Sequence, residues 1–82
     1  MDNKKEKEEF KGILHDFLIE ADELVEQIDH DLLELEGSHE DLELLNKIFR
    51  AVHTIKGSSS FLDLENITST AHQAEDILNK LR

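Results

Sequence analysis

One uninterrupted helical pattern of about 30 residues, from Lys7 to Glu36, most constrains the fold of this chain. Its apolar residues recur every three or four positions: Phe10, Ile13, Leu14, Phe17, Leu18, Ala21, Leu24, Val25, Ile28, Leu32 and Leu35. This spacing places one apolar stripe along one face of a helix, with acidic and polar residues opposite. A helix of this length cannot bury its stripe alone, so the pattern predicts packing against partner helices.

Two shorter helical patterns follow, at about 39–58 and about 64–81. Gly37 is expected to end the first helix, and Ser38 to cap the second through its hydroxyl. Asp63 is expected to cap the third helix in the same way. Because the chain also contains no proline, it is predicted to be all-α, an antiparallel up-down bundle with three helices.

Three helices of this kind leave one apolar surface uncovered and make a marginal bundle. We therefore expect residues 1–82 to form a single domain that is cut before its fourth core helix. Self-association of the chain through the uncovered surface is a second expectation.

Charge and composition narrow the classes of function. The formal net charge of −11 would repel nucleic acid and anionic membranes. The chain has no cysteine, which excludes disulfides and thiolate metal sites. It has neither an apolar run long enough to span a bilayer nor an N-terminal secretion signal. A cytoplasmic location is therefore expected.

A candidate chemical site begins at His53. Lys56 and Gly57 follow it by three and four residues, so the three positions are neighbours on one helix face. Imidazole is a nucleophile near neutral pH, because its reference pKa is about 6.5. The lysine offers positive charge to phosphoryl oxygens, and the glycine lets a partner surface approach. This combination suits a histidine that handles phosphate and is reached by another protein.

A second pair, His72 and Glu75, stands at i and i+3 on the predicted third helix. If the second and third helices are antiparallel across a short turn, both residues can come near His53. A carboxylate that accepts from one imidazole N–H fixes the tautomer and leaves the lone pair of the other nitrogen free. Glu75 is the candidate for this orienting role.

The segment from Phe49 to Leu62 resembles the phosphorylation-site helix of histidine phosphotransfer (HPt) domains. The resemblance is strongest to the N-terminal domain of the chemotaxis histidine kinase CheA, a subgroup that also carries a His-x-x-Glu pattern on the next helix. His72 and Glu75 match that pattern. The match covers about residues 45–81 closely, whereas the first helix matches only in length and amphipathic pattern.

The resemblance implies a bundle that normally has four core helices. It also implies that His53 accepts the γ-phosphoryl group of ATP from a separate kinase domain and passes it to an aspartate of a response regulator receiver domain. ATP and Mg²⁺ would bind that kinase domain, and this domain would be a carrier without a cofactor, not an enzyme by itself. Supporting roles are implied for further residues: Glu75 bonded to the ring, Lys56 and His72 beside it, and Gly57 and Ser58 where a partner docks.

The sequence departs from the family at two positions. Glycine often stands where this chain has Ser60 and Asp63. The predicted capping role accounts for Asp63, and Ser60 makes the connection less permissive. Neither position is expected to affect the phosphoacceptor chemistry.

Two alternatives from other classes remain open. A metal-binding bundle is conceivable because the chain has many carboxylates and five histidines: His15, His30, His39, His53 and His72. Ferritin-like sites need repeated Glu-x-x-His patterns inside the core, however, and this chain has one His-x-x-Glu. A structural dimerisation module, with the long first helix as a coiled coil, would leave His53, Lys56 and Glu75 unexplained.

Overall fold

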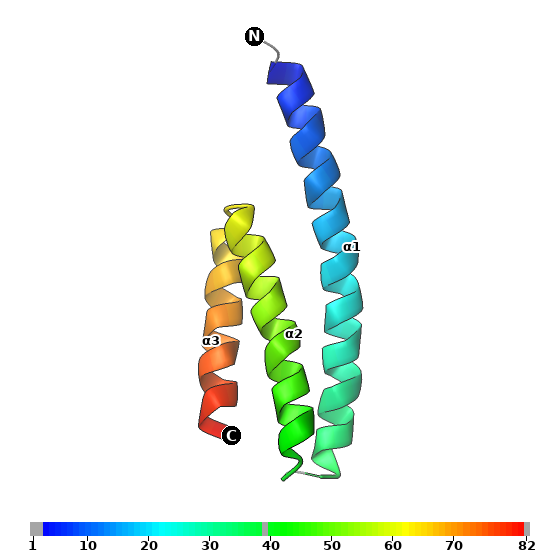
Figure 1. The fold of residues 1–82 in the computed structure, drawn as a ribbon, viewed down its shortest axis with the longest axis vertical. Coiled ribbons are helices and arrows are strands. Elements are labelled where there is room, and N and C mark those ends of the chain that lie inside the picture. Colours follow the sequence, from blue (N-terminus) through cyan, green and yellow to red (C-terminus); the bar gives the residue numbers. More distant parts are fainter. Residues whose placement is uncertain (1–2, 39, 82) are drawn as a thin grey trace.

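The computed structural model describes residues 3–38 and 40–81, which form three helices in up-down-up order (Figure 1). These are α1 (Asn3–Glu36), α2 (Leu42–Phe61) and α3 (Glu65–Leu81). The predicted all-α class is confirmed. Within the described residues, none of the helices combines the length and apolar character that a membrane span requires.

The central helix is α2, which packs against both of the others (Figure 1). Over the described ranges, α1 and α3 make no contact with each other. The molecule is therefore an open, elongated bundle measuring 55 × 20 × 15 Å, with the N-terminal part of α1 extending beyond the α2–α3 turn.

The core lies along α2. Its buried apolar cluster consists of Leu44, Leu45, Ile48, Val52, Ala71 and Leu78. Partly buried side chains from all three helices pack around it: Ile28, Leu35, Phe49, Ile55 and Ala74. Burial of apolar area is the main stabilising term for such a bundle.

The broad apolar stripe predicted for α1 is only partly buried. Apart from Gln27, the covered positions of α1 follow a three-four spacing: Leu14, Phe17, Ala21, Leu24, Ile28, Asp31 and Leu35. This is the narrow seam expected of a helix that packs on a single neighbour. The rest of the stripe is 42–54% exposed: Phe10, Ile13, Leu18, Val25 and Leu32. An uncovered apolar surface is thus present, as the sequence predicted.

The helix ends differ from the predicted ones. α1 begins at Asn3 instead of Lys7, because the Lys and Glu residues before Phe10 are good helix formers and need no neighbour. α2 lies three residues later than predicted at both ends, and α3 starts one residue later. His39, the predicted first residue of the second helix, lies outside the described residues.

The prediction that Ser38 caps α2 is wrong. Asp41 is the N-cap: its Oδ1 accepts the backbone N–H of Leu44 at 3.0 Å. Ser38 lies in the turn before it, where its carbonyl accepts from the Asp41 N–H. A carboxylate at this position also meets the positive end of the helix dipole, which favours Asp41 over the serine.

The prediction that Asp63 caps α3 is also wrong. Asp63 has a φ of 59°, in the left-handed region, and belongs to the end of α2. The Leu64 N–H bonds to the Ser59 carbonyl, and the Asp63 N–H bonds to the Ser60 carbonyl. These two bonds define a Schellman motif with Asp63 at the position that favours glycine. The serines therefore continue α2, and Leu64 takes the N-cap position of α3.

A buried hydroxyl pair ties α2 to α3 beside this turn. Ser59 is fully buried, and its Oγ lies 2.7 Å from the Oγ1 of Thr68. The same two hydroxyls can reach the carbonyls of Lys56 and Leu64. This bonding satisfies polar groups that burial would otherwise leave unpaired, and it fixes the register of the two helices near the site.

Candidate functional site around His53

The imidazole of His53 projects from the middle of α2 at the edge of the core. Its side chain is 60% exposed. One face lies against Phe49, with ring centroids 6.2 Å apart and ring planes 12° from parallel. The ring is thus held on one side and open to solvent on the other. The stacking of the ring on Phe49 was not predicted from the sequence.

Glu75 of α3 holds two side chains of α2 with its two carboxylate oxygens. Its Oε2 lies 3.3 Å from the Nδ1 of His53, and its Oε1 lies 2.6 Å from the Nζ of Lys56. The carboxylate is buried, with 8% of the side chain exposed, whereas Lys56 is 27% exposed. The structure therefore brings together three of the residues singled out in the sequence.

The ion pair between Lys56 and Glu75 was missed from the sequence alone. We expected the ammonium to face incoming phosphoryl oxygens, whereas here it binds the carboxylate. The signal was nevertheless present: Lys56 follows His53 by one helical turn, so a carboxylate opposite one of them can reach both.

The pKa of the Glu75 carboxyl lies below its ordinary value. The largest cause is the hydrogen bond from Lys56, and the bond with His53 and the charges of both groups act in the same direction. Burial raises the pKa but does not outweigh these bonds. Glu75 is therefore a carboxylate at neutral pH, and it can only accept hydrogen bonds.

This charge state determines what the His53 ring can do. A neutral imidazole facing a carboxylate carries its proton on Nδ1 and donates it to Oε2. The lone pair is then on Nε2, which has no hydrogen-bond partner among the described residues. The arrangement presents an oriented nucleophilic nitrogen on an open surface.

His72 lies apart from this hydrogen-bonded group. It is exposed and lines a surface hollow together with Lys56, Ser60 and Thr68. Within the described part of the chain, no hydrogen bond or ion pair connects it to Glu75 or His53. The structure thus places His72 next to the Lys56 side of the site.

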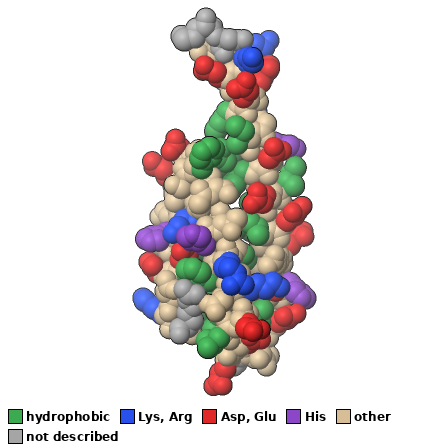
Figure 2. Space-filling model, viewed as in Figure 1, with side chains coloured by type: hydrophobic (Ala, Val, Ile, Leu, Met, Phe, Trp, Pro, Cys, Tyr) green, Lys and Arg blue, Asp and Glu red, His purple; other side chains and the backbone are tan. Residues whose placement is uncertain are grey.

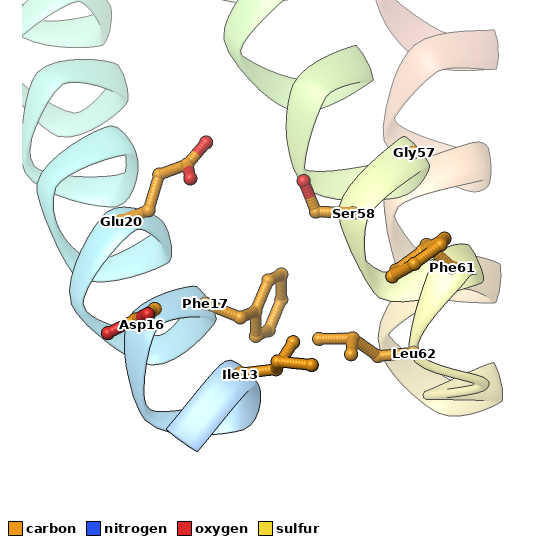
Figure 3. A pocket seen from close by; sticks show the side chains of 8 residues that line it. All are labelled: Ile13, Asp16, Phe17, Glu20, Gly57, Ser58, Phe61 and Leu62. Atoms are coloured by element: carbon orange, nitrogen blue, oxygen red, sulfur yellow. The ribbon is translucent and has the colours of Figure 1, made fainter. Parts of the chain in front are cut away.

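Gly57 and Ser58 lie one turn beyond His53 at the border of a second hollow. Figure 3 shows this hollow between α1 and the end of α2, with Ile13, Phe17 and Leu62 pointing toward one another. A Cβ added to Gly57 would meet no atom within 4 Å. The glycine is therefore not required by packing inside the domain, and its bare backbone is open to another molecule.

Figure 2 shows acidic side chains spread over the visible face, with histidine and basic side chains grouped among them. Within the described ranges, His53 and Glu75 do not belong to a group of three metal-ligand side chains. This geometry fits phosphoryl chemistry at a single imidazole better than a metal centre there.

Comparison with known proteins identifies the family of the chain. The family model of the Hpt domain matches residues 12–82. The chain therefore belongs to the histidine phosphotransfer family, whose members are phosphoryl carriers rather than catalysts by themselves.

The relatives indicate the subgroup. The chain is 57% identical over 75 residues to the sensor histidine kinase CheAY of Helicobacter pylori. The aligned residues cover 92% of this chain and 9% of the relative. It is 41% identical over 66 residues to the chemotaxis protein CheA of Klebsiella aerogenes, covering 80% of this chain and 10% of the relative. It is 33% identical over 70 residues to the chemotaxis protein CheA of Treponema pallidum, and these residues cover 85% of this chain and 9% of the relative. No solved structure gives a significant match.

These findings define a phosphoryl carrier of chemotaxis-type two-component signalling. Such carriers interact with histidine kinases and response regulators. The chain spans about a tenth of the length of these relatives.

Proposed function

We propose that His53 is the phosphoacceptor of this domain. The observation that carries the proposal is the contact between its Nδ1 and the ionised Glu75 carboxylate, which leaves Nε2 free and exposed. Among the described histidines, His53 alone is both oriented by a buried carboxylate and open to solvent.

The proposed reaction has two steps. The Nε2 lone pair attacks the γ-phosphorus of ATP, the P–O bond to ADP breaks, and ADP leaves with the bonding electrons. The ring becomes a phosphorylated imidazolium that keeps its Nδ1 proton, and Glu75 stabilises this positive charge. An aspartate carboxylate of a receiver domain then attacks phosphorus, and the imidazole leaves in its neutral form.

Lys56 and His72 are proposed to support these steps in different ways. Lys56 keeps Glu75 ionised through their 2.6 Å contact. Its ammonium and the neighbouring His72 border the same hollow, so the lysine can offer positive charge, and the imidazole a hydrogen bond, to phosphoryl oxygens. We propose that ATP and Mg²⁺ are held by the separate kinase domain, so that this domain needs no cofactor.

Docking is proposed around Gly57 and Ser58. The open surface at Gly57 and the hollow beside it allow the ATP-binding domain of a kinase or a receiver domain to approach His53 closely. Because one face must serve both partners, they would bind in turn.

The test is intact mass spectrometry after incubation with ATP and the catalytic part of a CheA kinase. We expect one phosphoryl group, retained at alkaline pH and lost in acid. His53→Gln should abolish the gain, whereas His15→Gln, which removes an exposed histidine of α1, should leave it intact. Equal phosphorylation of the His53→Gln variant would refute the proposal.

A further inference from the structure

Asp31 of α1 is a buried carboxylate that the proposed phosphotransfer does not use. Its side chain is 1% exposed, and its Oδ2 has no hydrogen-bond partner among the described residues. The other oxygen, Oδ1, has only a long contact of 3.5 Å with the ammonium of Lys47. Burial of a carboxylate with so little compensation is costly, so an additional ligand for this group would be favourable.

Two further metal-ligand side chains stand beside Asp31. His30 precedes it, and Glu34 lies one turn from His30, with His30 Nε2 and Glu34 Oε1 2.9 Å apart. One ligand atom from each of the three residues lies within 4.8 Å of the others. The cluster therefore joins an exposed pair to a buried carboxylate on one turn of α1.

We propose that His30, Asp31 and Glu34 form a binding site for a divalent transition-metal ion of the zinc type. One imidazole nitrogen and two carboxylate oxygens are a donor set that zinc accepts, with a fourth position left for water. Tetrahedral zinc needs ligand atoms about 3.4 Å apart, from bonds of about 2.0–2.2 Å. Small rotations of the exposed His30 and Glu34 side chains, which are 71% and 55% exposed, can supply the movement.

Lys47 is the group that the ion would replace. Its side chain is 50% exposed and bound to Asp31 only at 3.5 Å, so its ammonium can move into solvent. A doubly charged ion attracts the two carboxylates more strongly than one ammonium does. The net charge of −11 adds a general attraction for cations. The proposal is independent of His53 and of phosphotransfer.

The experiment is calorimetric titration of the metal-free chain, prepared without a histidine tag, with zinc chloride at pH 7. We expect one ion per chain, and we expect His30→Ala and Glu34→Gln each to weaken binding by about tenfold or more. His15→Ala and His53→Gln are matched controls that remove other exposed histidines, and both should bind zinc as the original chain does.

Thermal unfolding supplies a second readout. Zinc should raise the melting temperature of the original chain and of His15→Ala, but not that of His30→Ala, because only a site present in the folded state stabilises by mass action. Asp31→Asn should also lose binding, and its fold can be checked by circular dichroism. Absence of binding at millimolar zinc, or equal binding by the original chain and His30→Ala, would overturn the proposal.

Discussion

Glu75 is the residue on which the chemistry of His53 depends, because its two oxygens are divided between the imidazole and Lys56. The carboxylate selects the Nδ1–H tautomer, and the lysine keeps the carboxylate ionised. His53 supplies the nucleophile, whereas Glu75 positions it. Loss of His53 should therefore abolish phosphorylation, whereas loss of the Glu75 carboxylate should slow it.

Replacing Glu75 with Gln should slow phosphorylation of His53 by about ten- to a hundredfold, as loss of other groups that orient histidines does. The amide keeps the shape of the carboxylate but removes its charge. Nitrogen NMR of His53 should show a smaller share of the Nδ1–H tautomer in the variant. A slow variant with an unchanged tautomer population would contradict the orienting role.

The same substitution should change the pH dependence of stability. The pKa of Glu75 is lowered in the folded chain from an ordinary value of 4.5, so its contribution is complete above about that pH and is lost as pH falls through the lower folded pKa. At pH 7 the original chain should exceed Glu75→Gln in free energy of unfolding by about 1–3 kcal/mol. Urea unfolding at several pH values should show that this difference shrinks below about pH 4.5. A difference that grows in acid would contradict a stabilising role of the ionised Glu75 carboxylate.

At the scale of elements, the turn between α2 and α3 carries a local strain. Asp63 adopts a left-handed conformation with φ of 59°, which costs an L-residue roughly 1–2 kcal/mol and glycine nothing. Asp63→Gly should therefore raise the free energy of unfolding by about 0.5–1 kcal/mol, after the extra chain entropy of glycine is subtracted.

Chemical denaturation of both Asp63→Gly and Asp63→Ala would test this argument. The alanine variant is the control, because it removes the same carboxylate and keeps the Cβ. It should be no more stable than the original chain, and equal stabilisation by both substitutions would show that charge, not backbone conformation, is responsible.

The beginning of α2 offers a matched pair of caps. Asp41→Ala removes the acceptor of the Leu44 N–H and should lower the free energy of unfolding by about 1 kcal/mol. Ser38→Ala, three residues earlier, removes a hydroxyl that does not cap the helix and should be nearly neutral. Thermal unfolding of the two variants would check this. A larger loss of stability from Ser38→Ala than from Asp41→Ala would show that Ser38 caps the helix.

At the scale of the whole molecule, the open arrangement leaves apolar area in water. Ile67 lines an apolar hollow between α2 and α3 together with Val52, Ile55, Ala71 and Ala74. Large exposed apolar side chains on α1 add to this surface. Uncovered surface of this kind favours association.

We therefore expect the chain to self-associate as its concentration rises. Sedimentation equilibrium should show a mass between one and two chains at high concentration. Ile67→Lys, which places a charge in the hollow, should shift the distribution toward the monomer. The exposed Ile77→Lys, whose residue does not line this hollow, is the control, and an equal effect of both variants would place the association elsewhere.

Much of this molecule could be predicted from local sequence, and the limits of prediction are physical. The three helices and the common face of His53, Lys56 and Gly57 follow from the helical period, which depends only on spacing along the chain. The approach of Glu75 to His53 was also predictable, because a short turn fixes which parts of two antiparallel helices are opposite. The helix ends were less predictable: Asp41 caps α2 in place of Ser38, and Asp63 lies at the end of α2 instead of capping α3.

The sequence by itself determined an all-helical chain and a surface histidine beside a lysine and a glycine, because these features arise within single helices. Only the tertiary structure decided that Lys56 shares Glu75 with His53, and that Asp31 rather than a neighbouring apolar residue enters the seam between α1 and α2. The physical reason is that these contacts depend on how one helix is rotated and shifted against another. That geometry is set by packing of the whole core, which no local pattern records.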